Sequence, residues 1–452
     1  MITRKFGVTA GAGVLLLGAG AYFMYSLFAA QGQGELSQVP MNSVNTAPPA
    51  FIMAVDDSNS MMFERIFTGG DGRLQWNGSS FFKSAGVFYN SSASCTNDNQ
   101  VDCYLHLYPH ADYNKAYSYG RAIPPLDQFG FARSPTYNAS YFNPAVTYET
   151  WRRADRTLWD DPILTATRAD PRSEFKVPYG VTYNLEGFRT VSTEGFQVLK
   201  GMILPKGTTY YSDGTTCNTN RNDGLPDAKR QWVALDKDWT APTNCPNGIP
   251  IKYFPATYYL PEAAAAPAGY KTGDEYRPVI KDACGPGCNM RRYTIASENY
   301  DSGYAAAIRN FSIWFQYHRN RILSMVGSSS HAMAGVENMR VGYFTINNRV
   351  NVTMHDVSTQ RANLFNQIYG LNPSGGTPNR QAAAFLGEQF RRTDAGAPVV
   401  RACQRNGGML FTDEYTNSGN SAGGYGNADS AGGTHFPGAP FADNYSNTIA
   451  DI

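Results

Sequence analysis

The sequence has little charge and no excess of either sign. Only 17% of its 452 residues are charged, and 38 Lys and Arg residues stand against 37 Asp and Glu residues. Because nucleic-acid binding needs a concentrated basic face, this balance argues against nucleic acid as the main partner. Gly (44), Tyr (29) and Phe (25) are plentiful instead. That composition is typical of loop-rich exported surface proteins and unlike that of a helical cytosolic enzyme.

Two common enzyme patterns are also missing. His106 and His110 stand four residues apart, but Pro109 lies between them without an intervening Glu, so the zinc-protease pattern fails and we expect surface histidines. Ser58 and Ser60 are the candidate nucleophiles of a hydrolase, yet neither lies in a Gly-x-Ser-x-Gly turn. No histidine is clearly placed as their base. We therefore predict that the protein is not an enzyme, with a serine hydrolase as the alternative from a different class.

Residues 1–32 have the features of an export signal. A short basic start, Met1–Lys5, precedes an apolar run over residues 6–30, and Ala30 and Gly32 are small residues suited to signal-peptidase cleavage. The run is also long enough to remain as a membrane anchor. Its many glycines and alanines lower its hydrophobicity and favour cleavage. In both cases the rest of the chain is exported, and residues 33–49 form a polar, proline-containing linker.

The seven cysteines fit an oxidising compartment. Six of them form three sequence-local pairs, the pattern of disulfides that staple loops. These pairs are Cys95 with Cys103, Cys217 with Cys245, and Cys284 with Cys288. Cys403 is left over, and pairs either in another connectivity or with a cysteine beyond the end of the chain. Cys284 and Cys288 also match half of a zinc site, but no second Cys or His pair at suitable spacing supports that alternative.

Strands and helices alternate at the two ends of the exported region. The apolar run at residues 50–55 predicts a strand buried on both faces of a parallel sheet. Further strands are predicted at 339–346 and 408–411, and helices at 304–327, 360–369 and 380–390. The alternation predicts a parallel α/β sheet. Residues 50–62 and 300–452 would form this domain, which we expect to be incomplete at its C-terminal end.

Regular periodicity is mostly lost over residues 63–299. This stretch is rich in turn residues and aromatic side chains and contains six of the seven cysteines. A structureless loop of this length is implausible in a compact domain, so we predict an insertion module of short strands and long loops. Its tyrosines suit either a binding face or small cores. In the helix that follows, the spacing of Trp314 and Phe315 predicts core packing rather than a ligand platform.

Oxygen ligands follow the predicted strands. Asp56, Ser58 and Ser60 come directly after the first strand, Asp413 comes after the last, and Thr377 precedes a helix. Functional loops of open parallel sheets gather at the carboxyl ends of the strands, so we expect these side chains to meet. Carboxylates and hydroxyls without thiolate or imidazole suit Mg²⁺ or Ca²⁺. Few carboxylates leave such an ion able to accept a carboxylate from a partner as its last ligand.

This pattern resembles the metal-ion-dependent adhesion site of von Willebrand factor A domains. The resemblance implies that Ser58, Ser60 and Thr377 bind the ion directly, and that Asp56 and Asp413 bind it directly or through water. Mg²⁺ is the expected cofactor, with Mn²⁺ and Ca²⁺ as alternatives. The competing interpretation is that the fold has kept the residues of the site but that the site binds no metal.

Asn59 and Asp57 also lie within the motif. Asn59 replaces the glycine that the family usually has between the two serines, which matters little if its side chain points away. Asp57 is expected to be a solvated or capping neighbour rather than a ligand.

The order of further motifs is similar to that of the PilY/PilC family of type IV pilus tip-associated proteins. The sequence motifs that carry the resemblance lie at residues 310–321, 340–346, 374–378 and 403–406. It covers about residues 48–62 and 303–452, while the insertion matches no known motif. The resemblance implies a doubly wound A domain at the N-terminal end of a protein whose C-terminal part is a β-propeller.

The resemblance also implies a function. We expect metal-dependent adhesion or protein–protein interaction at the pilus tip of a Gram-negative bacterium, supporting pilus assembly, surface attachment and twitching motility. Minor pilins or other envelope proteins, and a surface ligand that offers a carboxylate, are the expected partners. The location would be the cell surface, the pilus tip or the outer membrane. A generic secreted A-domain envelope protein without a pilus role is the alternative.

Overall fold

The computed structural model describes residues 47–67, 74–84, 87–88, 103–109, 122–172, 181–212, 230–245 and 248–413. These residues belong to two compact units. The first contains residues 47–61, 151–158 and 325–413, and the second contains the described parts of 62–150 and 159–324. The predicted export signal, residues 1–32, lies outside the described residues. Among the residues that are described, no helix is long and apolar enough to cross a membrane.

A four-stranded sheet organises the first unit, in the order β16 (His355–Asp356), β15 (Arg340–Thr345), β1 (Ala50–Val55), β17 (Asn406–Phe411). β1 pairs in parallel with β15 on one side and with β17 on the other, whereas β16 is antiparallel to β15. β1 has the bounds that the sequence predicts. Its position between two strands explains its unbroken apolar run, because only Phe51 among its six residues is not buried.

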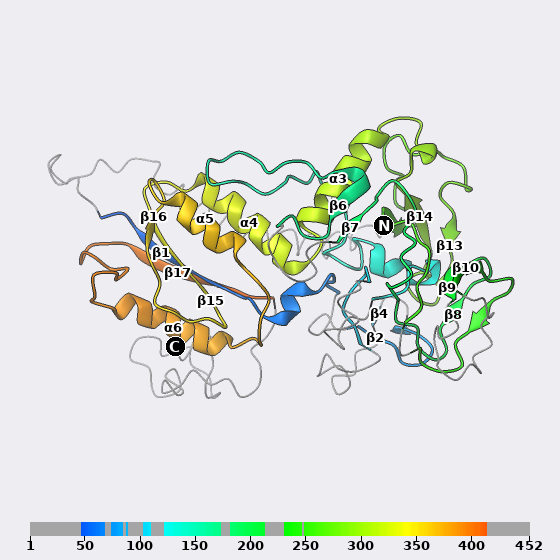
Figure 1. Cartoon of the computed structure of the whole chain (residues 1–452), viewed down its shortest axis with the longest axis horizontal. Coiled ribbons are helices and arrows are strands. Elements are labelled where there is room, and N and C mark those ends of the chain that lie inside the picture. The colour runs from blue at the N-terminus through cyan, green and yellow to red at the C-terminus, as the bar shows by residue number, and fades with distance from the viewer. Residues whose placement is uncertain are drawn as a thin grey trace, which may run out of the picture. The chain divides into compact units, whose positions relative to one another are not determined.

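Helices lie on both sides of this sheet (Figure 1). α5 (Arg361–Tyr369) lies on the same side as α4 (Arg321–Gly335), and α6 (Asn379–Arg391) lies on the opposite side. α6 approaches β17 closely, since a Cβ atom at Gly408 would lie 2.8 Å from a methyl group of Leu386. The core of this layer consists of Ile52, Ala54, Phe344, Ile346, Val352 and Ala382. The predicted helices at 360–369 and 380–390 are confirmed to within one residue.

The single helix predicted at residues 304–327 is wrong. The structure has two helices there, α3 (Tyr304–Tyr317) and α4, separated by three residues. The side chain of Asn320 accepts a hydrogen bond of 2.9 Å from the backbone N–H of Leu323. Asparagine in this position is a preferred start for a new helix, so the amphipathic spacing continues across a break in the backbone.

The two units divide the chain differently from the predicted domains. Residues 300–324, including α3, belong to the second unit, although the sequence placed them in the α/β domain. Residues 151–158, from the predicted insertion, belong to the first unit. There Trp151 is fully buried and its ring stacks on Tyr369 of α5 at 5.9 Å. A short segment of the insertion is therefore part of the core of the α/β unit.

Short strands and long connections form the described parts of the second unit. Its paired strands are β2 (Leu74–Gln75) with β5 (Cys103–Tyr104), β3 (Phe82–Ser84) with β4 (Val87–Phe88), β6 (Thr167–Arg168) with β7 (Thr182–Tyr183), β8 (Ile203–Leu204) with β11 (Trp239–Thr240), β9 (Thr209–Ser212) with β10 (Gln231–Ala234), and the triplet β12 (Thr257–Pro261), β14 (Met290–Thr294), β13 (Val279–Ile280). Each of these pairs is antiparallel. The 3₁₀ turns are η1 (Asn59–Met62, which begins in the first unit), η2 (Asp127–Arg133), η3 (Leu164–Ala166) and η4 (Ser297–Asn299).

Aromatic side chains fill the core of the second unit. Trp314 and Phe315 of α3 are buried there, as predicted. Many tyrosines of the insertion are also buried, so in the described part their bulk serves the core rather than an exposed face. Those with less than 2% exposure are Tyr104, Tyr108, Tyr141, Tyr183, Tyr210, Tyr258 and Tyr293. His106 is 3% exposed, so the prediction that it lies at the surface is wrong; His110 lies outside the described residues.

A buried ion pair crosses this core. The Glu64 carboxylate accepts a hydrogen bond of 2.7 Å from Nε of Arg319, and its other oxygen accepts the backbone N–H groups of Leu107 and Tyr108 at 2.7 and 3.0 Å. Arg319 also donates to the carbonyls of Phe315 and Ala169. Such pairs persist in an apolar interior only when their remaining polar atoms are satisfied. The pair therefore joins four segments of the unit.

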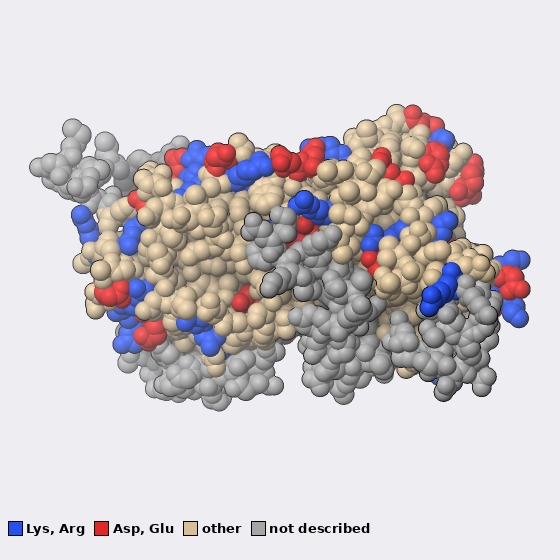
Figure 2. All heavy atoms as spheres, viewed as in Figure 1, with Lys and Arg blue, Asp and Glu red and all other residues tan. Residues whose placement is uncertain are grey.

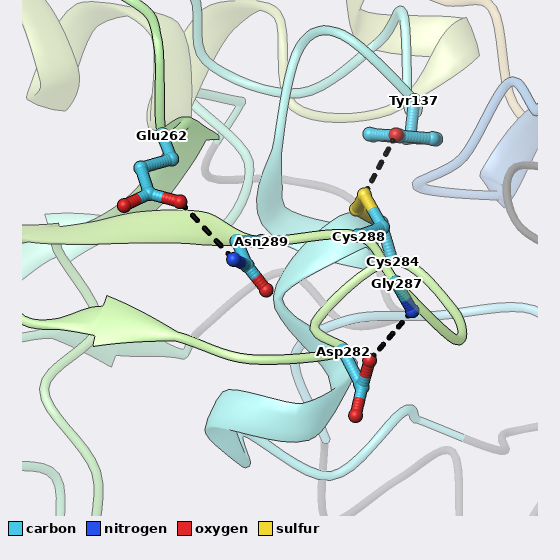
Figure 3. The surroundings of a disulfide bond; sticks show 7 residues. All are labelled: Tyr137, Glu262, Asp282, Cys284, Gly287, Cys288 and Asn289. Atoms are coloured by element: carbon cyan, nitrogen blue, oxygen red, sulfur yellow. Dashed lines mark hydrogen bonds between the residues drawn. A yellow bond between two sulfur atoms is a disulfide. The ribbon is translucent and has the colours of Figure 1, made fainter.

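Cys284 and Cys288, one of the predicted pairs, form a disulfide bond with a Cα–Cα distance of 5.3 Å. Figure 3 shows the Tyr137 hydroxyl directed at the Cys288 sulfur, 3.2 Å away. Cys245 is also disulfide-bonded. Cys403 is free and exposed. Cys95, Cys217 and the side chain of Cys103 lie outside the described part of the chain.

Charged side chains of both signs are interspersed on the described surface drawn in Figure 2. This agrees with the near balance of charge in the sequence.

Candidate metal centre

The carboxyl ends of β1 and β17 lie side by side. The backbone N–H of Asp56 donates to the carbonyl of Phe411 at 2.8 Å, which extends the ladder between the two strands by one bond. The Asp56 side chain is fully buried, and its Oδ1 accepts the backbone N–H of Ser58 at 2.7 Å. This local turn fixes the carboxylate at the start of the loop and directs the chain toward Ser60.

Three predicted ligands form a continuous chain of oxygen atoms. The hydroxyls of Ser58 and Ser60 are 2.8 Å apart, and the Ser60 hydroxyl donates to Oδ1 of Asp413 at 3.2 Å. Ser58 and Ser60 are buried, and Asp413 is partly buried. The structure therefore brings together side chains that are separated by 353 positions in sequence.

Thr412 is a member of the site that the sequence analysis missed. Its hydroxyl donates to Oδ2 of Asp56 at 2.6 Å and accepts a hydrogen bond of 3.1 Å from the side-chain amide of Asn379. Both oxygens of Asp56 are thus engaged, one by its own loop and one by the neighbouring strand end. The sequence contained a signal for this role, because Thr412 carries a hydroxyl and directly precedes Asp413 at the end of the apolar strand.

The loop that carries Thr377 lies against the Asp56–Ser60 loop. The backbone N–H of Asn59 donates to the carbonyl of Gly375 at 3.1 Å, and the N–H of Ser374 donates to the carbonyl of Asp57. Thr377 itself is 1% exposed and precedes α6. The backbone thus holds together all three segments that the sequence singled out.

Asp57 is not the solvated neighbour that the sequence allowed, because its side chain is only 5% exposed. Its Oδ1 accepts two hydrogen bonds from Asn347, one from the backbone N–H at 3.0 Å and one from Nδ2 at 2.9 Å. Asn347 follows β15 and was not singled out by sequence. The Asp57 side chain therefore binds another loop of the protein.

The oxygen set fits a small divalent cation. Adjacent ligands of an octahedral Mg²⁺ at about 2.1 Å are roughly 3 Å apart. The Ser58–Ser60 separation of 2.8 Å and the Ser60–Asp413 separation of 3.2 Å both lie near that value. Among the described residues no group of three or more His, Cys, Asp or Glu side chains could hold a metal. A centre here would depend on hydroxyls for most of its ligands.

Among the described residues, neither serine has a histidine as a hydrogen-bond partner. The hydrogen-bond partners of the two hydroxyls are each other and the Asp413 carboxylate. A serine nucleophile instead needs a base such as histidine within hydrogen-bond reach. The geometry gives no support to the hydrolase alternative.

No protein-family model and no solved structure matches the sequence. Curated proteins from Pseudomonas aeruginosa do match, each described as "Type IV pilus biogenesis factor PilY1". The chain is similar to PilY1.

The extent of the similarity to PilY1 differs between strains. The strain PAK protein is 29% identical over 196 residues, which cover 37% of this chain and 17% of the relative. The strain UCBPP-PA14 protein is 24% identical over 343 residues, which cover 71% of this chain and 24% of the relative. The matches thus span about a quarter or less of the length of these relatives.

Proposed function

We propose that the first unit is a von Willebrand A-type domain whose metal centre serves adhesion or protein–protein interaction in a type IV pilus system. The observation that carries the proposal is the oxygen cluster of Asp56, Ser58, Ser60 and Asp413 at the ends of two parallel strands. Three parallel strands, β15, β1 and β17, and helices on both sides of the sheet support the fold assignment. The similarity to PilY1 supports the pilus role.

Each ligand would contribute differently. Ser58, Ser60 and Thr377 would hold Mg²⁺ through neutral hydroxyls, and Asp56 and Asp413 would bind it directly or through water. Mn²⁺ or Ca²⁺ would be alternative occupants. A bound ion with few anionic ligands is electrophilic and supplies an attachment point for an outside carboxylate. The protein's own residues would fix the ion and leave one side open to the partner.

The partners would be minor pilins or other envelope proteins, together with a surface ligand that offers a carboxylate. The protein would act outside the cytoplasm, at the cell surface, the pilus tip or the outer membrane. Pilus assembly, surface attachment and twitching motility are the processes in which it would take part.

Attachment by living cells tests this function. Cells carrying Asp56→Ala in the chromosomal gene should attach to surfaces less than wild-type cells, because that change removes a ligand and the acceptor of the Ser58 N–H. Asp394→Ala serves as the control, since it removes an exposed carboxylate of the same unit. Normal attachment by Asp56→Ala cells with normal levels of the protein would refute the adhesive role.

The alternative is a generic secreted A-domain protein without a pilus role. It predicts the same metal binding but no pilus phenotype. Twitching motility and the number of surface pili distinguish the two: both should fall in Asp56→Ala cells if the protein acts in pilus assembly. Loss of attachment with unchanged pili and motility would favour the alternative.

A further inference from the structure

Three loops meet beside the oxygen cluster, and one pair of side chains joins them. Oδ1 of Asp57 accepts the backbone N–H of Asn347 at 3.0 Å and its Nδ2 at 2.9 Å. The same Nδ2 donates to the carbonyl of Gly376 at 2.8 Å. Asn347 thus connects the loop after β1 to the loop that carries Thr377. We call this pair, Asp57 with Asn347, the clamp.

The backbone of the Thr377 loop is built to approach the clamp. Gly375 has φ +78°, in the left-handed region that favours glycine. A Cβ atom there would lie 2.6 Å from Oδ1 of Asn347, which is closer than side-chain contacts allow. Two backbone hydrogen bonds join the same two loops as the clamp does. The N–H of Ser374 donates to the carbonyl of Asp57, and the N–H of Asn59 donates to the carbonyl of Gly375. The loop is therefore fastened immediately before Thr377.

The chemistry of Asp57 differs from that of Asp56. Asp56 lies within the oxygen cluster, with its oxygens accepting from Ser58 and Thr412. The Asp57 carboxylate is buried, and its two bonds go to Asn347. What the clamp needs from residue 57 is an acceptor oxygen, which an asparagine also supplies. It does not need the negative charge.

We infer that Asp57 and Asn347 are positioning residues of the metal centre, an inference that rests on the proposed function. They hold the Thr377 loop against the Asp56–Ser60 loop so that the hydroxyls of both loops face one ion. Partners that orient metal ligands in this way commonly change affinity by about 10–100-fold when removed. Asp57 acts as a hydrogen-bond acceptor, whereas Asp56 acts with its charge.

Isothermal titration of Mg²⁺ into the purified protein separates these roles. Asp57→Ala should weaken binding by about tenfold or more. Asp57→Asn, which keeps the acceptor, should stay within about threefold of wild type, while Asp56→Asn should lose binding. Asp394→Ala, the charge-matched control, should bind as wild type does. An Asp57→Asn protein as impaired as Asp57→Ala would overturn the inference, because the charge of Asp57 and not its acceptor oxygen would then be required.

Amide hydrogen exchange without metal tests the clamp independently of the metal centre. The amides of Ser374 and Asn59 should exchange about tenfold faster in Asp57→Ala and in Asn347→Ala, and at the wild-type rate in Asp57→Asn. Unchanged exchange in Asp57→Ala would overturn the clamp even if Mg²⁺ binds. If the wild-type protein binds no Mg²⁺, the proposed function and the positioning role both fail, and exchange then decides only whether the clamp orders the loop.

Discussion

Thr412 and Asp56 are joined by a hydrogen bond of 2.6 Å from the threonine hydroxyl to Oδ2 of the carboxylate. The two residues follow β17 and β1, which are neighbours in the sheet and far apart in sequence. The bond fixes the direction of a carboxylate whose other hydrogen bond within the described part of the chain is the turn to Ser58. A metal centre at this edge would therefore depend on a residue that is not among its predicted ligands.

Replacing Thr412 with valine should weaken Mg²⁺ binding by about tenfold, because the Asp56 carboxylate loses the donor that orients it. Thr412→Ser keeps the hydroxyl and should bind nearly as wild type does. Titration calorimetry of both variants measures the effect, with thermal unfolding as a check on the fold. Equal affinity in the valine variant and the wild-type protein would show that the bond does not orient the ligand.

The Glu64–Arg319 pair should be costly to break. Both side chains are about 5% exposed, and Arg319→Met leaves the Glu64 carboxylate buried without its cation. The free energy of unfolding should fall by about 3–5 kcal/mol. Urea denaturation, followed through the unfolding transition of the second unit, measures this loss of free energy.

A matched control is available on α3. Arg309 makes an ion pair of similar length with Asp161, but the two side chains are about half exposed. Arg309→Met should cost no more than about 1 kcal/mol, because solvent screens the pair. Similar losses in the two variants would mean that burial does not set the strength of the Glu64–Arg319 interaction.

Alkaline pH should destabilise the protein through its buried tyrosines. Burial raises the pKa of Tyr141 to about 12, from an ordinary value of 10.0. The unfolded chain therefore loses this proton first, and the stabilisation present below pH 10 is lost as the pH rises toward about 12. Removing this one group, as in Tyr141→Phe, should reduce the alkaline loss by about 2–3 kcal/mol.

Denaturation of wild-type and Tyr141→Phe proteins over this pH range measures the difference. The comparison is made on the slope of stability against pH, since the substitution also removes hydrogen bonds from Tyr141 to Thr257 and Tyr108. Identical slopes would show that Tyr141 does not keep its proton in the folded state.

The sequence predicted the first unit best where one local pattern determines the outcome. The apolar run of β1 gave its bounds, and the spacing of Leu364 and Ile368 located α5. It failed at the α3–α4 junction, because the amphipathic spacing continues while the backbone breaks at a side-chain cap on Leu323. Periodicity records which side faces the core and does not record where a helix restarts.

The sequence predicted which oxygen-bearing residues gather at the candidate site, but it did not predict which residues of the neighbouring strand ends hydrogen-bond to this loop. Asp56, Ser58 and Ser60 follow a strand and carry oxygen, so sequence alone places them at the sheet edge. Asn347 bonds to Asp57 and Thr412 bonds to Asp56, and both contacts form because β15 and β17 flank β1. Their roles depend on strand order, and strand order is a property of the folded chain.

The most direct test of the account is calorimetric titration of Mg²⁺, Mn²⁺ and Ca²⁺ into the purified protein, with Asp56→Ala and Thr377→Ala as variants. The account predicts saturable binding at one site in the wild-type protein and loss of that binding in both variants, each of which keeps its thermal transition. Absence of saturable binding in folded wild-type protein, or unchanged binding in both variants, would contradict it.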